Sequence, residues 1–170
     1  MSAETVLPYL LLAQGVMGGV DTLLNHELLE HLPRRPEAHR EIGLHSIREA
    51  LYGVLFIGLG WFEWHGTLAL AMGAVLVVEI AVDAVDEWTE NRIRVLPQNE
   101  RVLHLILALN LGAIVALLVP TLLDWHREPT TLLFHDRGWL SWLLTALAVS
   151  AAGGSVRDFL AWRRLSGRRP

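Results

Sequence analysis

The fold is decided by the stretch GTLALAMGAVLVVEIAVDAVDEWTE, which occupies residues 66–90. Its first half, through Val78, is apolar, and its second half carries five carboxylic acids. A block of about 18 or more predominantly apolar residues is long enough to cross a bilayer of about 30 Å as a helix. The stretch therefore predicts a membrane-spanning helix with one apolar half and one acidic half.

Four further apolar blocks flank this stretch. Of the 170 residues, 52% are hydrophobic, and the mean hydropathy of +0.37 is high for a soluble domain. We predict an all-α, polytopic membrane protein that forms a single domain over residues 1–170. Four of its five transmembrane helices are expected to form a bundle around a polar site. The helices are expected at about 6–32, 41–64, 66–90, 99–123 and 139–162.

The distribution of arginine predicts the orientation in the membrane. Loops on the cytoplasmic side of a membrane carry an excess of basic residues. The second and fourth loops contain only Arg127 and Arg137, so their side is expected to be external, with the N-terminus. The C-terminus is expected in the cytoplasm, and the location in the bacterial inner membrane. The arginines on the cytoplasmic side are Arg34, Arg35, Arg40, Arg92, Arg94, Arg163, Arg164, Arg168 and Arg169.

Composition excludes several kinds of site and partner. The chain has no cysteine, so it has neither disulfides nor thiolate ligands for metals. The net charge of −4 does not suggest nucleic acid as a partner. The first apolar run follows Glu4 rather than the basic segment of a signal peptide, so we expect it to remain as a helix in contact with membrane lipid.

Acids and histidines gather at the cytoplasmic ends of four of the predicted helices. Residues three or four apart share one face of a helix. The first helix is irregular in this respect, because Asp21, His26 and Glu27 point in different directions. The other three helices carry stripes formed by Glu41, His45 and Glu49, by Glu79, Asp83, Asp86 and Glu90, and by Glu100 and His104.

Charges at this depth need compensation. An ionised side chain near the centre of a membrane helix costs about 2.5–3.5 kcal/mol, so four unpaired carboxylates would cost on the order of 10 kcal/mol. Bound metal ions would compensate them, and a structural network of proton-sharing acids and histidines is the alternative. The predicted metal ligands are His45, Glu49, Asp83, His104, Glu79, Asp21, and either His26 or Glu27.

Several acids near the membrane surface are expected to be solvated instead. Glu41 and Glu100 lie near the interface by their distance from the helix ends. Glu30, Glu37, Glu87 and Glu90 are interpreted as charges in contact with water.

The mixture of ligands indicates the kind of metal. Imidazole among carboxylates favours iron or zinc over Mg²⁺ or Ca²⁺, and the number of ligands has room for two divalent ions. We predict two iron ions, with zinc as the alternative. The arrangement is similar to carboxylate-bridged di-iron four-helix bundles. Those proteins usually carry Glu-x-x-His, whereas this chain carries Glu-x-x-x-His at Glu27/His31, Glu41/His45 and Glu100/His104, so no catalytic residue is transferred.

A second resemblance covers most of the chain. The stretches DTLLNHELLEHLP (21–33), LHSIREALY (44–52) and LPQNERVLHLILALN (96–110) resemble a family of uncharacterised bacterial integral-membrane proteins. The resemblance implies a location in the membrane and no particular activity.

Four functions from different classes fit these observations. The first is a di-iron oxidoreductase that uses O₂ to act on a lipid-soluble substrate such as a quinone or an acyl chain. The second is a zinc-dependent membrane hydrolase, in which Zn²⁺ activates water. The third is a divalent cation or proton transporter, because acids inside a membrane commonly mark ion paths. The fourth is a non-catalytic subunit with a membrane partner, and a homo-oligomer also remains open.

Overall fold

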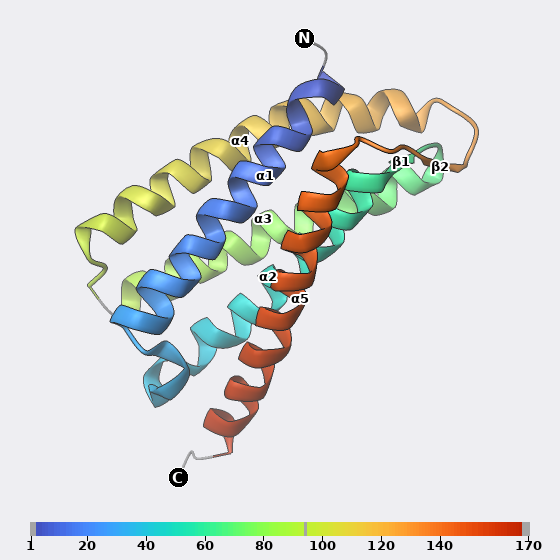
Figure 1. Cartoon of the computed structure of the whole chain (residues 1–170). Coiled ribbons are helices and arrows are strands. Elements are labelled where there is room, and N and C mark those ends of the chain that lie inside the picture. Colours follow the sequence, from blue (N-terminus) through green and yellow to red (C-terminus); the bar gives the residue numbers. More distant parts are fainter. Residues whose placement is uncertain (1–2, 94, 168–170) are drawn as a thin grey trace.

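The computed structural model describes residues 3–93 and 95–167, and its fold is all-α apart from one small two-stranded sheet (Figure 1). Arg94, Arg168 and Arg169, which were used to predict the orientation, lie outside the described residues. The five long helices are apolar enough to cross a membrane, which confirms the predicted helix type and number. They are α1 (Ala3–Asp21), α2 (His39–Trp61), α3 (Thr67–Ile93), α4 (Gln98–His126) and α5 (Trp139–Ser166).

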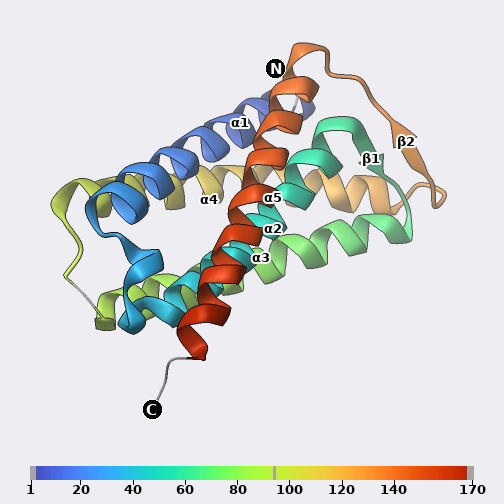
Figure 2. The same ribbon diagram turned by 60° about the horizontal axis from the view of Figure 1, so that its bottom comes forward.

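The helices pack as a ring in which α1 and α2 hardly touch. Helix α2 packs most extensively against α5, and α3 packs between α2 and α4. Helix α1 packs against α4 and α5. The loop between α1 and α2 lies on the side of the C-terminus. The N-terminus lies on the opposite side, with the two-stranded sheet (Figure 1, Figure 2). Long side chains therefore bridge the space between α1 with its continuation and α2, as Gln14 and Tyr52 do.

Apolar side chains fill the half of the bundle nearer the two-stranded sheet. Leu11, Leu55, Met72, Ile114 and Leu118 are all at most 1% exposed and belong to one continuous cluster. A smaller apolar cluster lies at the other end, beneath the loop between α1 and α2. It consists of Leu32, Ala38, Ile42, Ala161 and Leu165.

One predicted helical segment is wrong. Residues 62–64 were expected in the second helix, but α2 ends at Trp61 and Phe62–Trp64 form strand β1. This strand pairs in antiparallel register with β2 (Leu132–Phe134), and Phe62 faces Phe134 across the ladder. The pairing partner is about 70 residues away, so tertiary contacts override the local pattern, as is usual for short β segments. Gly66 makes the close approach possible, because its φ of 60° is left-handed and any side chain there would overlap Thr130.

Strand β1 contains an acid, Glu63, that forms hydrogen bonds with two histidines. Burial alone would raise the pKa of Glu63, but hydrogen bonds with His65 and His135 outweigh burial and lower it below the ordinary 4.5. The ionised carboxylate therefore stabilises the two-stranded sheet above pH 4.5, and this contribution is lost as the pH falls through the lowered pKa. We expect hydrogen exchange in residues 62–64, corrected for intrinsic rates, to increase when the pH falls below 4. The Glu63→Gln protein should show no such step; a step of the same size in this variant would contradict the assignment.

Candidate metal centre

Seven side chains converge in the half of the bundle nearer the C-terminus, and we call them the acid–histidine cluster. They come from α1 and its continuation, α2, α3 and α4. They form two overlapping groups with His26 in common, and a third group joins Glu90 and His104 to the exposed Glu87. Within each group the potential ligand atoms lie within 4.8 Å of one another. These buried groups could hold metal ions. The first group is Asp21, His26, Glu100 and His104, and the second is His26, Glu41, His45 and Glu90.

A π-helix explains how the first helix contributes two ligands. The α-helix ends at Asp21, and residues Thr22–Leu29 continue as a π-helix, η1. Its wider turn, closed by i→i+5 hydrogen bonds, turns His26 toward the side that Asp21 occupies. Their Oδ2 and Nε2 atoms lie 3.6 Å apart. Asn25 donates a hydrogen bond of 2.7 Å to Asp21 and accepts one of 2.8 Å from Asn99 on α4, which fixes this carboxylate.

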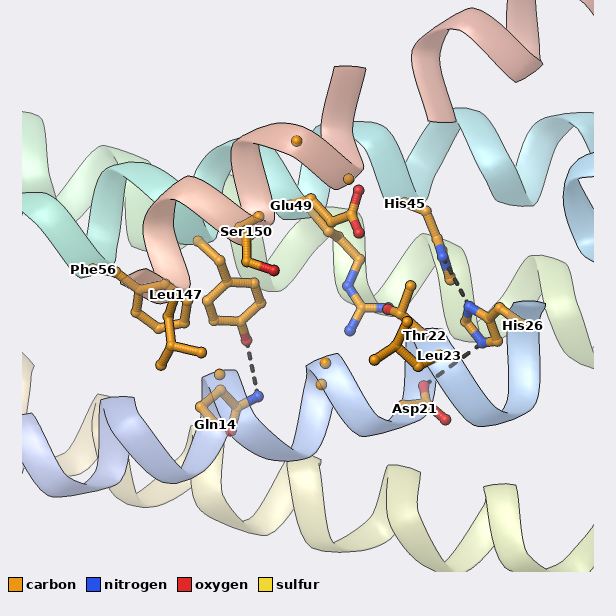
Figure 3. Close-up of a pocket in the computed structure, with 18 of the residues that line it drawn as sticks. Gln14, Asp21, Thr22, Leu23, His26, His45, Glu49, Phe56, Leu147 and Ser150 are labelled. Carbon is orange, nitrogen blue, oxygen red and sulfur yellow. Dashed lines mark hydrogen bonds and ion pairs between the residues drawn. The ribbon is translucent and has the colours of Figure 1, made fainter. Parts of the chain in front are cut away.

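Helix α2 supplies Glu41 and His45, which are one turn apart and buried. His45 meets His26 across the gap between the helices, where the two Nδ1 atoms are 3.1 Å apart (Figure 3). The second nitrogen of His45, Nε2, lies 3.1 Å from Asp86 Oδ2 on α3. One nitrogen of this imidazole therefore faces the cluster, and the other is held by a carboxylate.

His104 on α4 repeats the same arrangement. Its Nε2 atom lies 3.2 Å from Asp21 Oδ2 inside the first group. Its Nδ1 atom lies 3.0 Å from Glu87 Oε2 on α3. A histidine that binds a metal usually donates its other N–H to a carboxylate, which orients the ring. Asp86 and Glu87 provide that partner for His45 and His104, respectively.

Glu90 lies between the two groups. Its Oε1 atom is 3.7 Å from His45 Nε2 in the second group, and its Oε2 atom is 3.6 Å from His104 Nδ1 near the first. Its side chain is only 1% exposed to solvent. The two nitrogens that it faces are also those that Asp86 and Glu87 contact, and Glu90 belongs both to the second group and to a third group that it forms with Glu87 and His104. An ion held by Glu90 and His104 would therefore use the Nδ1 atom of His104.

Two separations at the Nε2 atom of His26 are longer than direct hydrogen bonds and fit ligands around an ion. The Nε2 atom of His26 lies 3.4 Å from a Glu100 oxygen and 3.9 Å from a Glu90 oxygen. Hydrogen bonds between nitrogen and oxygen are shorter, about 2.7–3.2 Å. Atoms that bind one ion at about 2.1 Å lie about 3.0 Å apart at right angles and about 4.2 Å apart when opposite. The residues present therefore fit a metal ion on geometric grounds.

Half of the predicted ligands lie in this cluster and half do not. Asp21, His26, His45 and His104 meet there. Asp83 pairs instead with Arg48, at 2.8 Å. The other three lie elsewhere: Glu27 pairs with Arg157 at 2.8 Å, Glu49 lies against Gly154 of α5, and Glu79 faces Tyr52 nearer the apolar core.

Three acids of the cluster were not among the predicted ligands. Glu41 and Glu100 are fully buried, although their sequence positions suggested the interface. The expectation that Glu90 is solvated is wrong, because its side chain is only 1% exposed and faces His26, His45 and His104 on the neighbouring helices. The Glu-x-x-x-His spacing of Glu41/His45 and Glu100/His104 was the signal that pointed to two of these acids.

An arginine neutralises the acids beside the cluster. Arg48 donates to Asp86 at 2.7 Å and to Asp83 at 2.8 Å, which joins α2 to α3. Removing one member of a buried ion pair typically costs about 3–5 kcal/mol. We expect Arg48→Met to lower the free energy of unfolding by about that amount, which should appear as a lower melting temperature in detergent. The control is Arg127→Met, whose pair with Asp124 is more than two-thirds exposed; equal melting temperatures for the two variants would contradict the role of Arg48.

Comparison with protein-family models, with curated proteins and with solved structures gives no match.

Proposed function

We propose that this protein is a membrane-embedded oxidoreductase with two iron ions, which uses O₂ to oxidise a lipid-soluble substrate. The observation that carries the proposal is the acid–histidine cluster, in which four carboxylates and three imidazoles from four helices share one buried site. Bound iron would supply the redox chemistry with O₂. The following features of the chain support the proposal.

The composition of the cluster favours two iron ions over one zinc ion. Catalytic zinc typically has three protein ligands and one open position, whereas this cluster offers seven ligands in two groups. Mixed carboxylate and imidazole ligands from a four-helix bundle are typical of carboxylate-bridged di-iron sites. Glu90 belongs to two of the three groups of potential ligands, so it would be the carboxylate that two ions share.

The remainder of the bundle argues against transport. A transporter needs polar groups on both sides of its binding site to carry an ion through the membrane. Here the half of the bundle nearer the two-stranded sheet is packed with apolar side chains such as Leu55, Ile114 and Leu118. These side chains also keep water from reaching the cluster from that side. The site is therefore accessible from one side only, as suits an enzyme whose substrate arrives from the lipid.

The experiment combines metal analysis with oxygen uptake. The full-length protein is purified in detergent, its iron and zinc are measured, and O₂ uptake is followed with a short-chain quinol as reductant. Each quinol gives up two electrons and two protons, and one O₂ takes up four of each to form two water molecules, so two quinols should be consumed per O₂. We expect iron and O₂ uptake in the wild type and at least a tenfold loss of uptake in His104→Ala.

The matched control is His126→Ala, on the same helix, because His126 contacts the backbone of Gly66 far from the cluster. This variant should keep both its iron and its O₂ uptake. Zinc without O₂ uptake would favour the hydrolase instead. A protein that binds neither metal would contradict the proposal.

A further inference from the structure

A pocket joins the acid–histidine cluster to the lipid. It has a volume of about 330 Å³ and lies among α1, α2 and α5. Asp21, His26 and His45 line one end of it, so the pocket reaches the candidate metal centre (Figure 3). Phe56 and Leu147 lie at the other end, and Leu107 of α4 also lines the pocket. Such a size is at the lower end of the range for small-molecule sites, about 300–1,000 Å³.

One face of α2 forms the floor of this pocket. His45, Glu49, Tyr52 and Phe56 follow one another at intervals of three or four residues, so they share a face. Eleven residues separate His45 from Phe56, which corresponds to about 16 Å along the helix. The floor therefore changes from charged, to hydroxyl-bearing, to apolar with increasing distance from the cluster. This gradient matches a molecule that has a polar head and an apolar chain.

Small residues open the pocket toward the lipid. Helices α1 and α5 meet where Leu147 lies against Gly15, and they diverge toward the C-terminal side (Figure 1). In the gap lie Gly18 and Gly19 on α1 and Gly153 on α5, and a Cβ atom at any of the three would meet nothing within 4 Å. Both helices are long and apolar enough to cross a membrane. A molecule dissolved in the lipid could therefore enter sideways between α1 and α5.

The polar groups of the lining favour an uncharged head. Both arginines in it are already paired with two acids each, Arg48 with Asp83 and Asp86, and Arg157 with Glu27 and Asp158. The carboxylate of Glu49 also faces the pocket (Figure 3). An anionic head would therefore meet excess negative charge. Neutral hydrogen-bonding groups are provided by Gln14, Tyr52 and Ser150, and Gln14 donates to Tyr52 at 3.0 Å.

We propose that the pocket binds a neutral lipid-soluble molecule, whose apolar chain ends in a head with hydroxyl or carbonyl oxygens, and that this molecule enters from the lipid between α1 and α5. The head lies at His45 and Glu49, and the chain lies along Phe56 and Leu147. Quinols and long-chain alcohols share this chemistry. The proposal identifies the substrate class for the proposed oxidoreductase and rests on that function for its catalytic meaning.

The test measures binding rather than turnover. The full-length protein in lipid nanodiscs is incubated with a long-chain alcohol that carries a photoreactive diazirine on its chain, and the labelled peptides are mapped by mass spectrometry. We expect labelling of peptides that contain Phe56, Leu107 or Leu147, and at least fivefold competition by a decyl-substituted benzoquinone. A fatty acid of the same length should compete at least fivefold less well than the quinone. Stronger competition by the fatty acid would overturn the neutral head.

Variants of the entrance decide the route. Gly153→Leu and Gly19→Leu fill the gap between α1 and α5 and should reduce labelling at least fivefold. The matched control is Gly112→Leu, on α4 outside the pocket, where a side chain likewise meets nothing within 4 Å. Equal labelling in all three variants, or labelling outside the pocket, would overturn the proposal.

Metal content is measured on the same samples, which separates this proposal from the proposed function. If the wild type binds no metal but its pocket is labelled and Gly153→Leu is not, the oxidoreductase assignment fails and the binding site stands. If metal is bound but the pocket is not labelled, the binding site fails and the metal centre stands.

Discussion

Replacing Glu90 with glutamine is expected to reduce bound metal from about two ions per chain to one or none. The physical reason is its position, with one oxygen facing His45 and the other facing His104. The substitution replaces a bridging carboxylate by a neutral amide, whose nitrogen cannot serve as the second ligand. Because the two ions would share Glu90, the loss of one weakens the binding of the other.

Elemental analysis of the purified protein checks this prediction. The control is Glu37→Gln, at an exposed position in the loop between α1 and α2, which should leave the metal content unchanged. The elution volume in gel filtration shows whether both variants are folded. An unchanged metal content in a folded Glu90→Gln protein would rule out the bridging position.

Removal of the metal is expected to destabilise the whole protein. A ligand that binds only the folded state at a concentration 1,000 times its Kd stabilises that state by about 4 kcal/mol. In this chain the loss is reinforced, because Asp21, Glu41, Glu90 and Glu100 would remain buried close together without a cation. We expect a strong chelator to lower the melting temperature in detergent by several degrees, and added iron to restore it.

The Glu90→Gln protein provides the reference for this experiment. Because it should already lack most of its metal, its melting temperature should respond to chelator much less than that of the wild type. If the chelator leaves the wild type unchanged at every concentration, the acids and histidines form a structural network stabilised by shared protons.

The helices were predictable because each depends on a local property. The apolar run that begins at Gly66 is long enough to span a membrane by itself, and Pro33 and Pro97 separate it and its neighbours from the next helices. The two-stranded sheet was not predictable in the same way. Residues 62–64 become a strand only because residues 132–134 lie beside them, and no local pattern encodes that contact.

The candidate site was predictable in its location and in its histidines, but Asp21 was the one acid of the cluster among the predicted ligands. Depth was counted along each helix separately, which favoured Glu49 and Glu79 because they lie farther from the helix ends. Burial at the helix ends depends on which side chains the neighbouring helices present there, and Glu90 and Glu100 lie inside, facing His26.

The first helix illustrates the remaining difficulty. On an ideal α-helix, Asp21 and His26 would point in different directions, and the sequence was interpreted in that way. The π-helix from Thr22 to Leu29 changes the direction of His26 and brings it to both metal groups. Single turns of π-helix occur inside α-helices and are frequent at functional sites, but the spacing of acids and histidines along the first helix does not indicate one.

The central claim is that acids and imidazoles from four helices hold a pair of iron ions in the membrane. The most direct measurement is diffraction from crystals of the full-length protein at wavelengths on either side of the iron absorption edge. Two anomalous peaks are predicted, one among Asp21, Glu100 and His104 and the other among Glu41, His45 and Glu90, with His26 between them. A cluster that contains only water and hydrogen bonds among its own side chains, in protein purified with iron present, would contradict the claim.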